Sequence, residues 1–514
     1  MSEIRSVQLK VGLEVHVELA TRTKMWTRVA SPAHPECGEV EPNTLIDPVV
    51  LALPGALPVA NRAAVEMSML VGLALGCRIA PFTKWDRKSY FYPDLPKNYQ
   101  ISQYDLPLCA DGSFDLEYED GGKAKTKRVG IIRAHLEEDA GKLLHEWPGG
   151  AGGRAIDYSI VDYNRAGTPL LEIVTQPDFE EAGEVVAFAQ TLRNICRFLG
   201  VTQGIMQKGQ MRFEPNINTI ITLDDGRTVA TPIVEIKNLN SFRSLERAIE
   251  YELAQQPVRW RQDGKEMGPG AKSTRGWDDD RGESFLQREK EDAHDYRYFS
   301  DPDLLPVRIS AEWVERVRAG LPELPQQRRK RYASDFGIAE KEAAVLVEER
   351  AVCDFFERAV DSTGKTGLER EKIGKTVANL ILQYGMKRAN ERDTLASELG
   401  ISPEQVGQIA LLREEGAIGS NAADEVFGAL CESDESAEAA AKRLNLIQVT
   451  DTAALEGWVD AVIADPANAQ TVEDVRGGKM AAIGRLVGGV MKQSGGQADA
   501  KKVQEMLRVK LGVK

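Results

Sequence analysis

The sequence predicts an α+β protein in which a domain built on a mixed sheet is followed by helical domains. Up to about residue 300, short strand-like segments alternate with glycine- and proline-rich turns, whereas beyond about residue 310 the pattern is helical and rich in Ala, Glu and Leu. Strands and helices of the first part do not alternate strictly, which favours α+β over a doubly wound sheet. Because 514 residues suffice for about three domains, we expect domains over residues 1–300, 301–444 and 445–514.

The strands of the first domain are predicted by alternation with a period of two. From Val7 to Leu19 every second residue is apolar, so this strand should bury one face and leave the other polar. Further strands are expected over residues 129–136, 156–163, 170–175, 217–223 and 229–236.

The predicted helices have recognisable starts. Asn61 can cap a first helix, and a second is expected over residues 185–199, so that both cover one face of the sheet. In the second half, Ser402 followed by Pro403 is typical of a helix start. Helical periodicity there predicts two antiparallel helices, over residues 401–418 and 421–430.

Charge and composition exclude several classes of protein. A net charge of −14 argues against a chain that coats nucleic acid over its whole surface, although from Thr471 onward nine Lys and Arg against four Asp and Glu give +5. The six cysteines form no C-x-x-C pair, which indicates neither a disulfide framework nor a cysteine-rich zinc site and fits a reducing cytosol. We expect no signal peptide and no membrane span. Walker, Rossmann and serine-hydrolase motifs do not occur.

The polar face of the first strand carries Glu14, His16 and Glu18. Residues two apart on a strand lie about 6.5 to 7 Å from each other on one side. Carboxylates flanking an imidazole suit Mg²⁺ or Mn²⁺, although an ordinary solvated strand face is the alternative.

Two later segments concentrate acids in the same domain. The stretch RAHLEEDAGK places His135 and Glu137 on one side of a strand end, followed by Glu138, and is either a cation site or a polar turn. Glu172 lies between apolar neighbours in a predicted strand, so its carboxylate needs a partner, a metal or a raised pKa.

A third segment mixes cations and aromatic rings. Residues 85–100, WDRKSYFYPDLPKNYQ, have the composition of a nucleotide or single-stranded RNA site, and a packed surface loop is the alternative.

These segments occur in the order typical of one family. The segments are VGLEVHVEL, DRKSYFYPDLPKNYQISQYD, HLEEDAGK, DYNRAGTPLLEIVTQPD, VEIKNLNSF and AHDYRYFSDPDLLPV. The chain closely resembles the B subunits of the glutamine-dependent aspartyl/glutamyl-tRNA amidotransferases, over nearly its whole length.

The resemblance implies an ATP-dependent ligase acting on mischarged Asp-tRNA(Asn), Glu-tRNA(Gln) or both. In such complexes an amidase A subunit releases ammonia from glutamine, a small C subunit joins the other two subunits, and ammonia reaches the B subunit through a channel. ATP and Mg²⁺ would then serve to phosphorylate the side-chain carboxylate before ammonia displaces phosphate. An aminoacyl-tRNA synthetase is a further candidate partner, in the cytoplasm.

The resemblance also implies a cradle-shaped catalytic domain, a helical domain and a small basic tail that binds tRNA. By its metal-site motif, the catalytic cation ligands are expected to be Glu14, His16, Glu138 and Glu172, with Glu137 as a further candidate. Fixed cations suit phosphoryl groups, so the candidates for phosphate, ATP or the tRNA 3′ end are Arg87, Lys88, Lys97 and Arg165. The tail residues expected to bind tRNA are Lys479, Arg485, Lys492, Lys501 and Lys502.

The chain departs from the family pattern in two places. The family usually has Arg-x-Asp-x-Asn-x-Ser where this chain has Glu214 as the acid, one methylene longer, which puts a role for Glu214 in doubt. Some members carry four cysteines after the first strand, but this chain offers Cys37 and His34, so we expect no structural zinc.

Two other interpretations remain. The chain could be a non-catalytic tRNA-binding scaffold for the amidase, although the intact acidic residues favour an enzyme. The related archaeal-type subunit dedicated to Glu-tRNA(Gln) carries a large inserted domain, for which Pro302, leading directly into the helical half, leaves no room.

Overall fold

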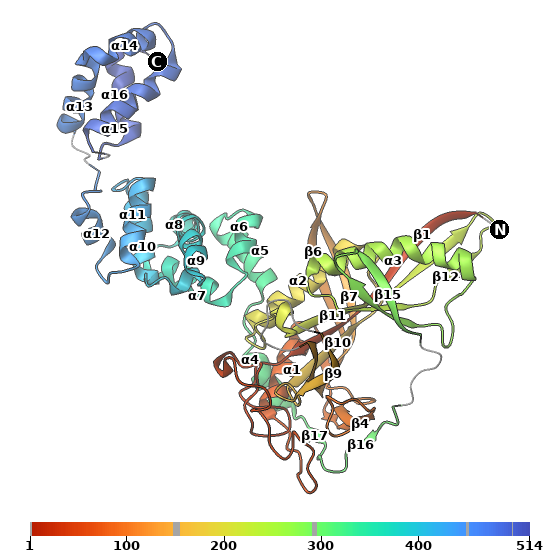
Figure 1. Ribbon diagram of the computed structural model, residues 1–514. Coiled ribbons are helices and arrows are strands. Elements are labelled where there is room, and N and C mark those ends of the chain that lie inside the picture. The colour runs from red at the N-terminus through yellow and green to blue at the C-terminus, as the bar shows by residue number, and fades with distance from the viewer. Residues whose placement is uncertain (1–2, 147–154, 290–295, 449–451, 496, 514) are drawn as a thin grey trace. The chain divides into compact units, whose positions relative to one another are not determined.

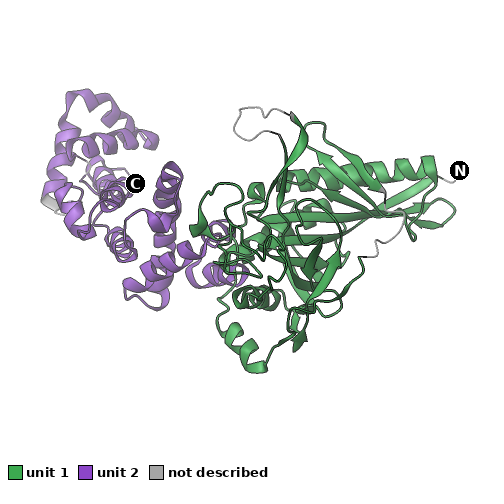
Figure 2. Ribbon diagram, turned by 60° about the horizontal axis from the view of Figure 1, so that its bottom comes forward, with its two compact units in different colours: residues 1–324 green, residues 325–514 purple. Residues whose placement is uncertain are grey.

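The chain folds into two compact units, residues 1–324 and 325–514 (Figure 2). The computed structural model describes residues 3–146, 155–289, 296–448, 452–495 and 497–513. The units divide later than the boundary expected at residue 300, because Leu304, Ile309 and Val317 are buried in the core of the first unit. The further boundary at residue 444 stays a prediction.

The first unit is built on one large sheet, which confirms the α+β class (Figure 1). Its neighbouring strands are antiparallel except for the parallel pair β13 and β14. From edge to edge the order is β15 (Glu283–Glu289), β14 (Ser273–Asp278), β13 (Val234–Lys237), β11 (Met211–Leu223), β1 (Ile4–Glu18), β10 (Pro169–Thr175), β7 (Lys123–Glu138), β6 (Cys109–Asp120) and β2 (Arg78–Ile79), with β12 (Thr228–Ala230) also paired to β11.

Helices cover one face of this sheet. They are α1 (Arg62–Ala74), α2 (Ala182–Phe198) and α3 (Phe242–Asp263), with α4 (Ala311–Ala319) packed on α1. Alternation along β1 turns Val11, Val15 and their apolar companions into the core beneath the helices. Consequently Glu14 and His16 lie on the opposite, polar face, where the acids of the neighbouring strands gather.

Three small sheets complete the unit. The small sheets are β4 (Asp86–Ser89) with β5 (Tyr99–Ser102) and β16 (Phe299–Ser300), β3 (Phe82–Thr83) with β17 (Val307–Arg308), and β8 (Lys142–Glu146) with β9 (Ala155–Asp162). The strand expected over residues 156–163 is present as β9, which pairs with β8 outside the large sheet. The strand expected over residues 229–236 is divided into β12 and β13.

The second unit is helical, as expected. Asn61 in the first unit and Ser402 here cap their helices as the sequence predicts, each accepting a backbone N–H. The helices are α5 (Pro325–Phe336), α6 (Glu340–Leu346), α7 (Arg350–Ser362), α8 (Gly367–Asn379), a π-helical segment (Leu380–Gly385), α9 (Met386–Arg392), α10 (Pro403–Glu414), α11 (Ser420–Leu430), α12 (Ala437–Arg443), α13 (Thr452–Ala464), α14 (Ala469–Arg476), α15 (Ile483–Gln493) and α16 (Ala500–Leu511).

The last four helices, α13 to α16, share a core of their own around Leu455, Leu486 and Leu507. Short 3₁₀ turns lie at Pro35–Cys37, Met206–Lys208, Ala396–Glu398, Pro466–Asn468 and Met480–Ala482. Among the helices in the described ranges, none combines the length and apolar character needed to cross a bilayer.

Candidate functional site

The candidate site lies on the polar face where β1, β10 and β7 run side by side. In this register His16 is directly opposite Glu172, and Glu172 is directly opposite His135. Glu137 follows His135 by two residues and so lies on the same face, diagonal to Glu172. Strand pairing thus brings together side chains from residues 16, 137 and 172 of the sequence.

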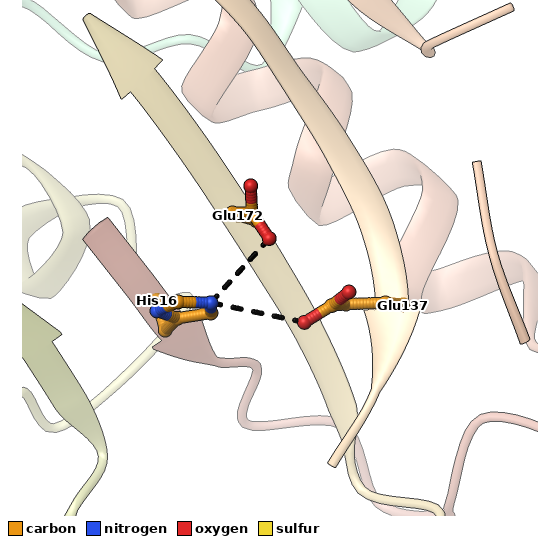
Figure 3. Close-up of side chains that lie close together, drawn as sticks. All are labelled: His16, Glu137 and Glu172. Carbon is orange, nitrogen blue, oxygen red and sulfur yellow. Dashed lines mark ion pairs between the residues drawn. The ribbon is translucent and has the colours of Figure 1, made fainter. Parts of the chain in front are cut away.

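The resulting cluster consists of His16, Glu137 and Glu172 (Figure 3). His16 Nε2 lies 3.4 Å from Glu172 Oε2 and 3.8 Å from Glu137 Oε1. One donor atom from each residue lies within 4.8 Å of the others, a spacing that a single cation could bridge. Two carboxylates and an imidazole are also the donor chemistry of a Mg²⁺ or Mn²⁺ site, so the residues present fit the metal that the resemblance implies.

Crowding of these groups shifts their pKa values in opposite directions. Burial opposes the charge on His16, but Glu172 and Glu214 outweigh it and raise the pKa of His16 to about 9. Burial, reinforced by Glu172, raises the pKa of Glu137 to about 7. Despite burial, His135 and His16 hold the pKa of Glu172 below its ordinary value. The cluster therefore retains a proton near neutral pH that a bound cation would displace.

His135 stands behind the cluster, with Nε2 3.8 Å from Glu172 Oε2. Burial lowers the pKa of His135 to about 4, so its imidazole is neutral at pH 7. The sequence places His135 next to the acids but does not by itself indicate a role for it in the site.

Two of the expected ligands lie outside this cluster. Glu138 points to the other face of β7, where its carboxylate meets Lys97 Nζ at 2.5 Å and accepts the N–H of Ile101 at 3.0 Å. Glu14 shares the face of His16, but its Oε1 accepts a hydrogen bond from Asn216 Nδ2 at 2.9 Å. Burial, followed by the charge of Glu172, raises the pKa of Glu14. The structure thus brings Glu137 into the cluster in place of Glu138 because neighbouring residues of a strand face opposite ways.

β11 supplies a second layer of charge next to His16. Glu214 Oε1 lies 3.9 Å from His16 Nδ1, and Glu214 Oε2 pairs with Lys237 Nζ at 2.5 Å. The longer side chain of Glu214 therefore still reaches the site. The alternation of Arg212 and Glu214 with apolar neighbours in β11 is the sequence signal that could have placed both on the polar face.

Arg212 contacts Asp139, one of two neighbouring buried acids, and the other is Glu18. Its Nη1 donates to Asp139 Oδ2 at 2.9 Å, and Arg165 Nε lies 3.7 Å from the same oxygen. These guanidiniums hold the pKa of Asp139 below its ordinary value despite burial. Burial and the neighbouring Asp139 raise the pKa of Glu18 to about 8, so Glu18 is a largely neutral acid at pH 7.

A cationic cavity of about 340 Å³ borders this layer. It is lined by Glu214 and by five cations, Lys142, Arg165, Lys208, Arg212 and Lys237. An adjoining cavity of about 440 Å³ shares Lys142, Arg165 and Lys208 and is bordered by Glu18. Five cations beside an acidic cluster form a wall suited to phosphate groups. Of these five, only Arg165 was expected from the sequence.

The other three cations expected to bind phosphate have different surroundings. Arg87 pairs with Asp301 at 2.7 Å and with Asp303 at 2.9 Å, and Lys97 pairs with Glu138. Lys88 lies with its Nζ 5.3 Å from the ring centroid of Tyr296. Burial opposes its charge, but Glu137 and other neighbours raise the pKa of Lys88 above its ordinary value. Lys88 is thus a fixed cation that compensates the acidic cluster.

Aromatic rings from two distant segments meet around Lys88. β16 pairs with β4, which brings Tyr296 and Tyr298 to the aromatic stretch of residues 85–100. Tyr298 stacks on Tyr104 with centroids 4.2 Å apart, and Phe91 is 76% exposed. Lys88 and these rings therefore form a cation-aromatic surface beside the acidic cluster, and its role as a nucleotide or RNA site stays a prediction.

The expected tRNA-binding residues all lie on α15, α16 and the turn before α15. Lys479, which is 73% exposed at its side chain, pairs with Asp474 at 3.0 Å. The remaining four are exposed on the surface of their helices: Arg485, Lys492, Lys501 and Lys502.

The chain matches known protein families and individual proteins over most of its length. Residues 9–315 match the family model described as the GatB/GatE catalytic domain, and residues 354–511 match that described as the GatB domain. The chain is 45% identical over 485 residues to the B subunit of the aspartyl/glutamyl-tRNA(Asn/Gln) amidotransferase of Rhodopirellula baltica, covering 94% of this chain and 93% of the relative. It is 42% identical over 505 residues to the corresponding protein of Moorella thermoacetica, covering 98% and 99%.

Proposed function

Since the chain belongs to the family of aspartyl/glutamyl-tRNA(Asn/Gln) amidotransferase B subunits, we propose that its first unit performs the ATP-dependent activation and amidation of the mischarged aminoacyl group. The protein is a subunit of a glutamine-dependent, tRNA-dependent amidotransferase. The observation that carries the proposal is the cluster of His16, Glu137 and Glu172 beside a cavity walled by five cations. Such a pairing suits a reaction in which a carboxylate and a phosphoryl group must approach each other.

The chemistry explains why the site needs both the acidic cluster and the cationic cavity. A carboxylate is a poor electrophile, so its oxygen first attacks the γ-phosphorus of ATP, and ADP leaves. Ammonia then attacks the acyl carbon, phosphate leaves, and the attacking nitrogen loses a proton to give the amide. Mg²⁺, when bound, would neutralise charge on the transferring phosphoryl group.

The protein residues have separate tasks in this proposal. His16, Glu137 and Glu172 hold the cation, with Glu14 available at its margin. Lys142, Lys208 and the two arginines of the cavity wall hold phosphate oxygens, and Asp139 fixes the direction of both arginines. Glu138, Lys97 and Arg87 act as supports, because each is engaged in an ion pair and none of the three lines the cationic cavity.

The aromatic surface around Lys88 is the proposed place for the tRNA 3′ end. Exposed rings accept unpaired bases by stacking, and it lies next to the acidic cluster where the esterified amino acid must arrive. The basic face of α15 and α16 would hold the tRNA body. We propose a cytoplasmic heterotrimer with an amidase A subunit as ammonia source and a small C subunit, and an aminoacyl-tRNA synthetase as a further partner.

The test uses the complex assembled with its A and C partners. Glutamine, ATP, Mg²⁺ and either Asp-tRNA(Asn) or Glu-tRNA(Gln) are supplied, and amide formation and glutaminase activity are measured separately. Glu172→Gln and Glu137→Gln should abolish amide formation and Mg²⁺ binding while glutamine hydrolysis continues. The matched control is Glu36→Gln, because the Glu36 side chain is 75% exposed and distant in sequence from the cluster.

Glu138→Gln distinguishes the ligand set expected from the family motif, which includes Glu138, from the cluster in the structure, which contains Glu137. We expect this variant to lose phosphorylation of the aminoacyl group, because Lys97 and the β5 backbone lose their charged partner. It should nevertheless retain Mg²⁺ binding, unlike Glu137→Gln. Unimpaired amidation by Glu172→Gln would contradict the proposed role of the cluster, whereas tRNA binding by the unchanged complex without amidation or ATP turnover would favour the non-catalytic scaffold.

A further inference from the structure

A second cationic cavity, of about 290 Å³, lies in the first unit between α3, β13 and β14. None of its lining residues lines the cavity beside Arg165. Four cations border it, Arg259, Lys265, Lys272 and Arg275, against a single lining acid, Asp263. The proposed amidation mechanism uses none of these side chains.

The two arginines are held in place from behind by one fully buried carboxylate. Glu252 is completely enclosed, and one of its oxygens accepts from Arg259 Nη2 and, at 3.2 Å, from Gln256 Nε2. The other accepts from Ser284 Oγ at 2.6 Å and lies 3.7 Å from Arg275 Nε. Burial and the neighbouring Arg259 lower the pKa of Arg275. One carboxylate is therefore shared by two guanidiniums and cannot neutralise both. The cavity wall keeps positive charge, which a bound anion would neutralise.

Trp260 provides a second, independent feature of the same wall. It lines the cavity, and its indole Nε1 is buried without a hydrogen-bond partner in the described part of the chain. A buried N–H donor left unpaired is costly, so a ligand acceptor at this place would be stabilising. The indole ring, Pro232 and Pro269 add apolar wall next to the cations.

We propose that this cavity is a binding site for a small phosphate ester of about the size of a nucleoside monophosphate. Arg259, Lys272 and Arg275 hold the phosphate, and the side of the cavity formed by Trp260 takes the organic part. The volume is at the lower end of the range of small-molecule sites, which argues against a larger ligand. A dianion matches the multiple cations better than a monocarboxylate does.

Lys272 also connects this cavity to the polar face of the sheet. Its Nζ lies 3.1 Å from Glu235 Oε2, and Lys237 Nζ lies 3.0 Å from Glu235 Oε1. Lys237 is in turn the partner of Glu214 beside His16. A ligand phosphate that draws Lys272 away from Glu235 therefore changes the charge balance next to the candidate cation cluster.

The test is calorimetric titration of the full-length chain, without tRNA or glutamine, so that it is independent of amidation. The probes are inorganic phosphate, AMP and adenosine, and the expected order of affinity is AMP, then phosphate, with adenosine not binding. Lys272→Gln should weaken AMP binding about tenfold, as expected for losing a hydrogen bond to a charged group. Trp260→Phe removes only a neutral N–H donor on the side of the organic part and should weaken AMP binding about threefold. In the nuclear magnetic resonance spectrum, the indole N–H signal that Trp260→Phe removes should shift when AMP is added.

Two controls separate this cavity from its neighbours. Lys125→Gln changes an exposed lysine of the β6–β7 hairpin and should leave AMP binding unchanged. Arg165→Gln removes a cation of the other cavity and should also leave this binding event intact. AMP binding lost in Arg165→Gln but not in Lys272→Gln, equal binding of adenosine, or no AMP binding in the millimolar range would each overturn the proposal.

Discussion

Binding of Mg²⁺ to the cluster of His16, Glu137 and Glu172 is expected to release protons in a pH-dependent amount. A cation takes deprotonated ligands, whereas the structure keeps protons on two of these groups near neutral pH. The pKa of His16 is raised to about 9 and that of Glu137 to about 7, while Glu172 is already ionised because its pKa is lowered.

The number of protons follows from these pKa values. At pH 7 His16 is almost fully protonated and Glu137 is half protonated, so binding should release about 1.5 protons per cation. At pH 8 the release should fall to about one proton, nearly all of it from His16. His16→Asn removes the larger contribution. Because the charge of His16 helps to lower the pKa of Glu137, Glu137 in this variant should release more than half a proton at pH 7.

The release is measured by titrating the full-length chain with Mg²⁺ in two buffers of equal pH and different ionisation enthalpy. The difference in observed heat, divided by the difference in ionisation enthalpy, gives the number of protons. Glu36→Gln should behave as the unchanged chain. Heats that do not depend on the buffer, or a release that increases from pH 7 to pH 8, would contradict the assignment of His16 and Glu137 as the protonated ligands.

Three further outcomes are expected. Without metal, the raised pKa of His16 stabilises the fold, fully below pH 6.5, and this contribution is lost as the pH rises through about 9. In urea titrations the contribution of His16 to the free energy of unfolding should therefore fall by about 2 kcal/mol between pH 7 and 9. The decrease should be smaller in His16→Asn. Charge reversal of Lys479 and Lys492 to glutamate should weaken tRNA binding and reduce its salt dependence, whereas unchanged affinity across a salt series would count against the tail assignment. Gly400→Ala should lower the free energy of unfolding, measured by thermal unfolding, by about 3 kcal/mol or more, because φ is +94° and a Cβ would collide with a backbone carbonyl. Gly416→Ala, where φ is +71° and the space around the Cβ is open, should lower it by about 1 kcal/mol.

The fold was predictable where a periodic pattern was long. Thirteen residues of alternation placed β1 and its polar face, and capping side chains placed the starts of α1 and α10. The order of strands was not predictable, because a strand's sequence indicates which face is buried but not which strand lies beside it. That is why residues 156–163 were recognised as a strand although their partner β8 and their separation from the large sheet were not.

The candidate site shows the same limit at the level of single residues. Pairing of β1 with β10 and of β10 with β7 decides that Glu172 meets both histidines. Alternation had put His135 and Glu137 on one side, and the structure follows that argument, whereas the expectation from the family motif favoured Glu138 as ligand. The side chain of Glu138 cannot face His16 while Glu137 does, because the two are consecutive in a strand.

The two halves of the proposed site differ in how firmly the fold holds them, and this difference bears on the mechanism. The cation ligands come from the middle and ends of three adjacent strands, where a slip of one residue would turn every side chain to the opposite face, so their geometry is fixed by the sheet. Three of the cavity cations come from less regular backbone, since Arg165 lies in the turn before β10, Lys208 in a 3₁₀ turn and Lys142 at the first residue of β8. Side chains on loops and strand ends can adjust to successive charges on ATP, acyl phosphate and free phosphate, whereas a cation centre must hold the carboxylate in one place throughout. Rearrangement during the reaction should therefore be confined to the cationic wall, with the cluster on β1, β7 and β10 unchanged.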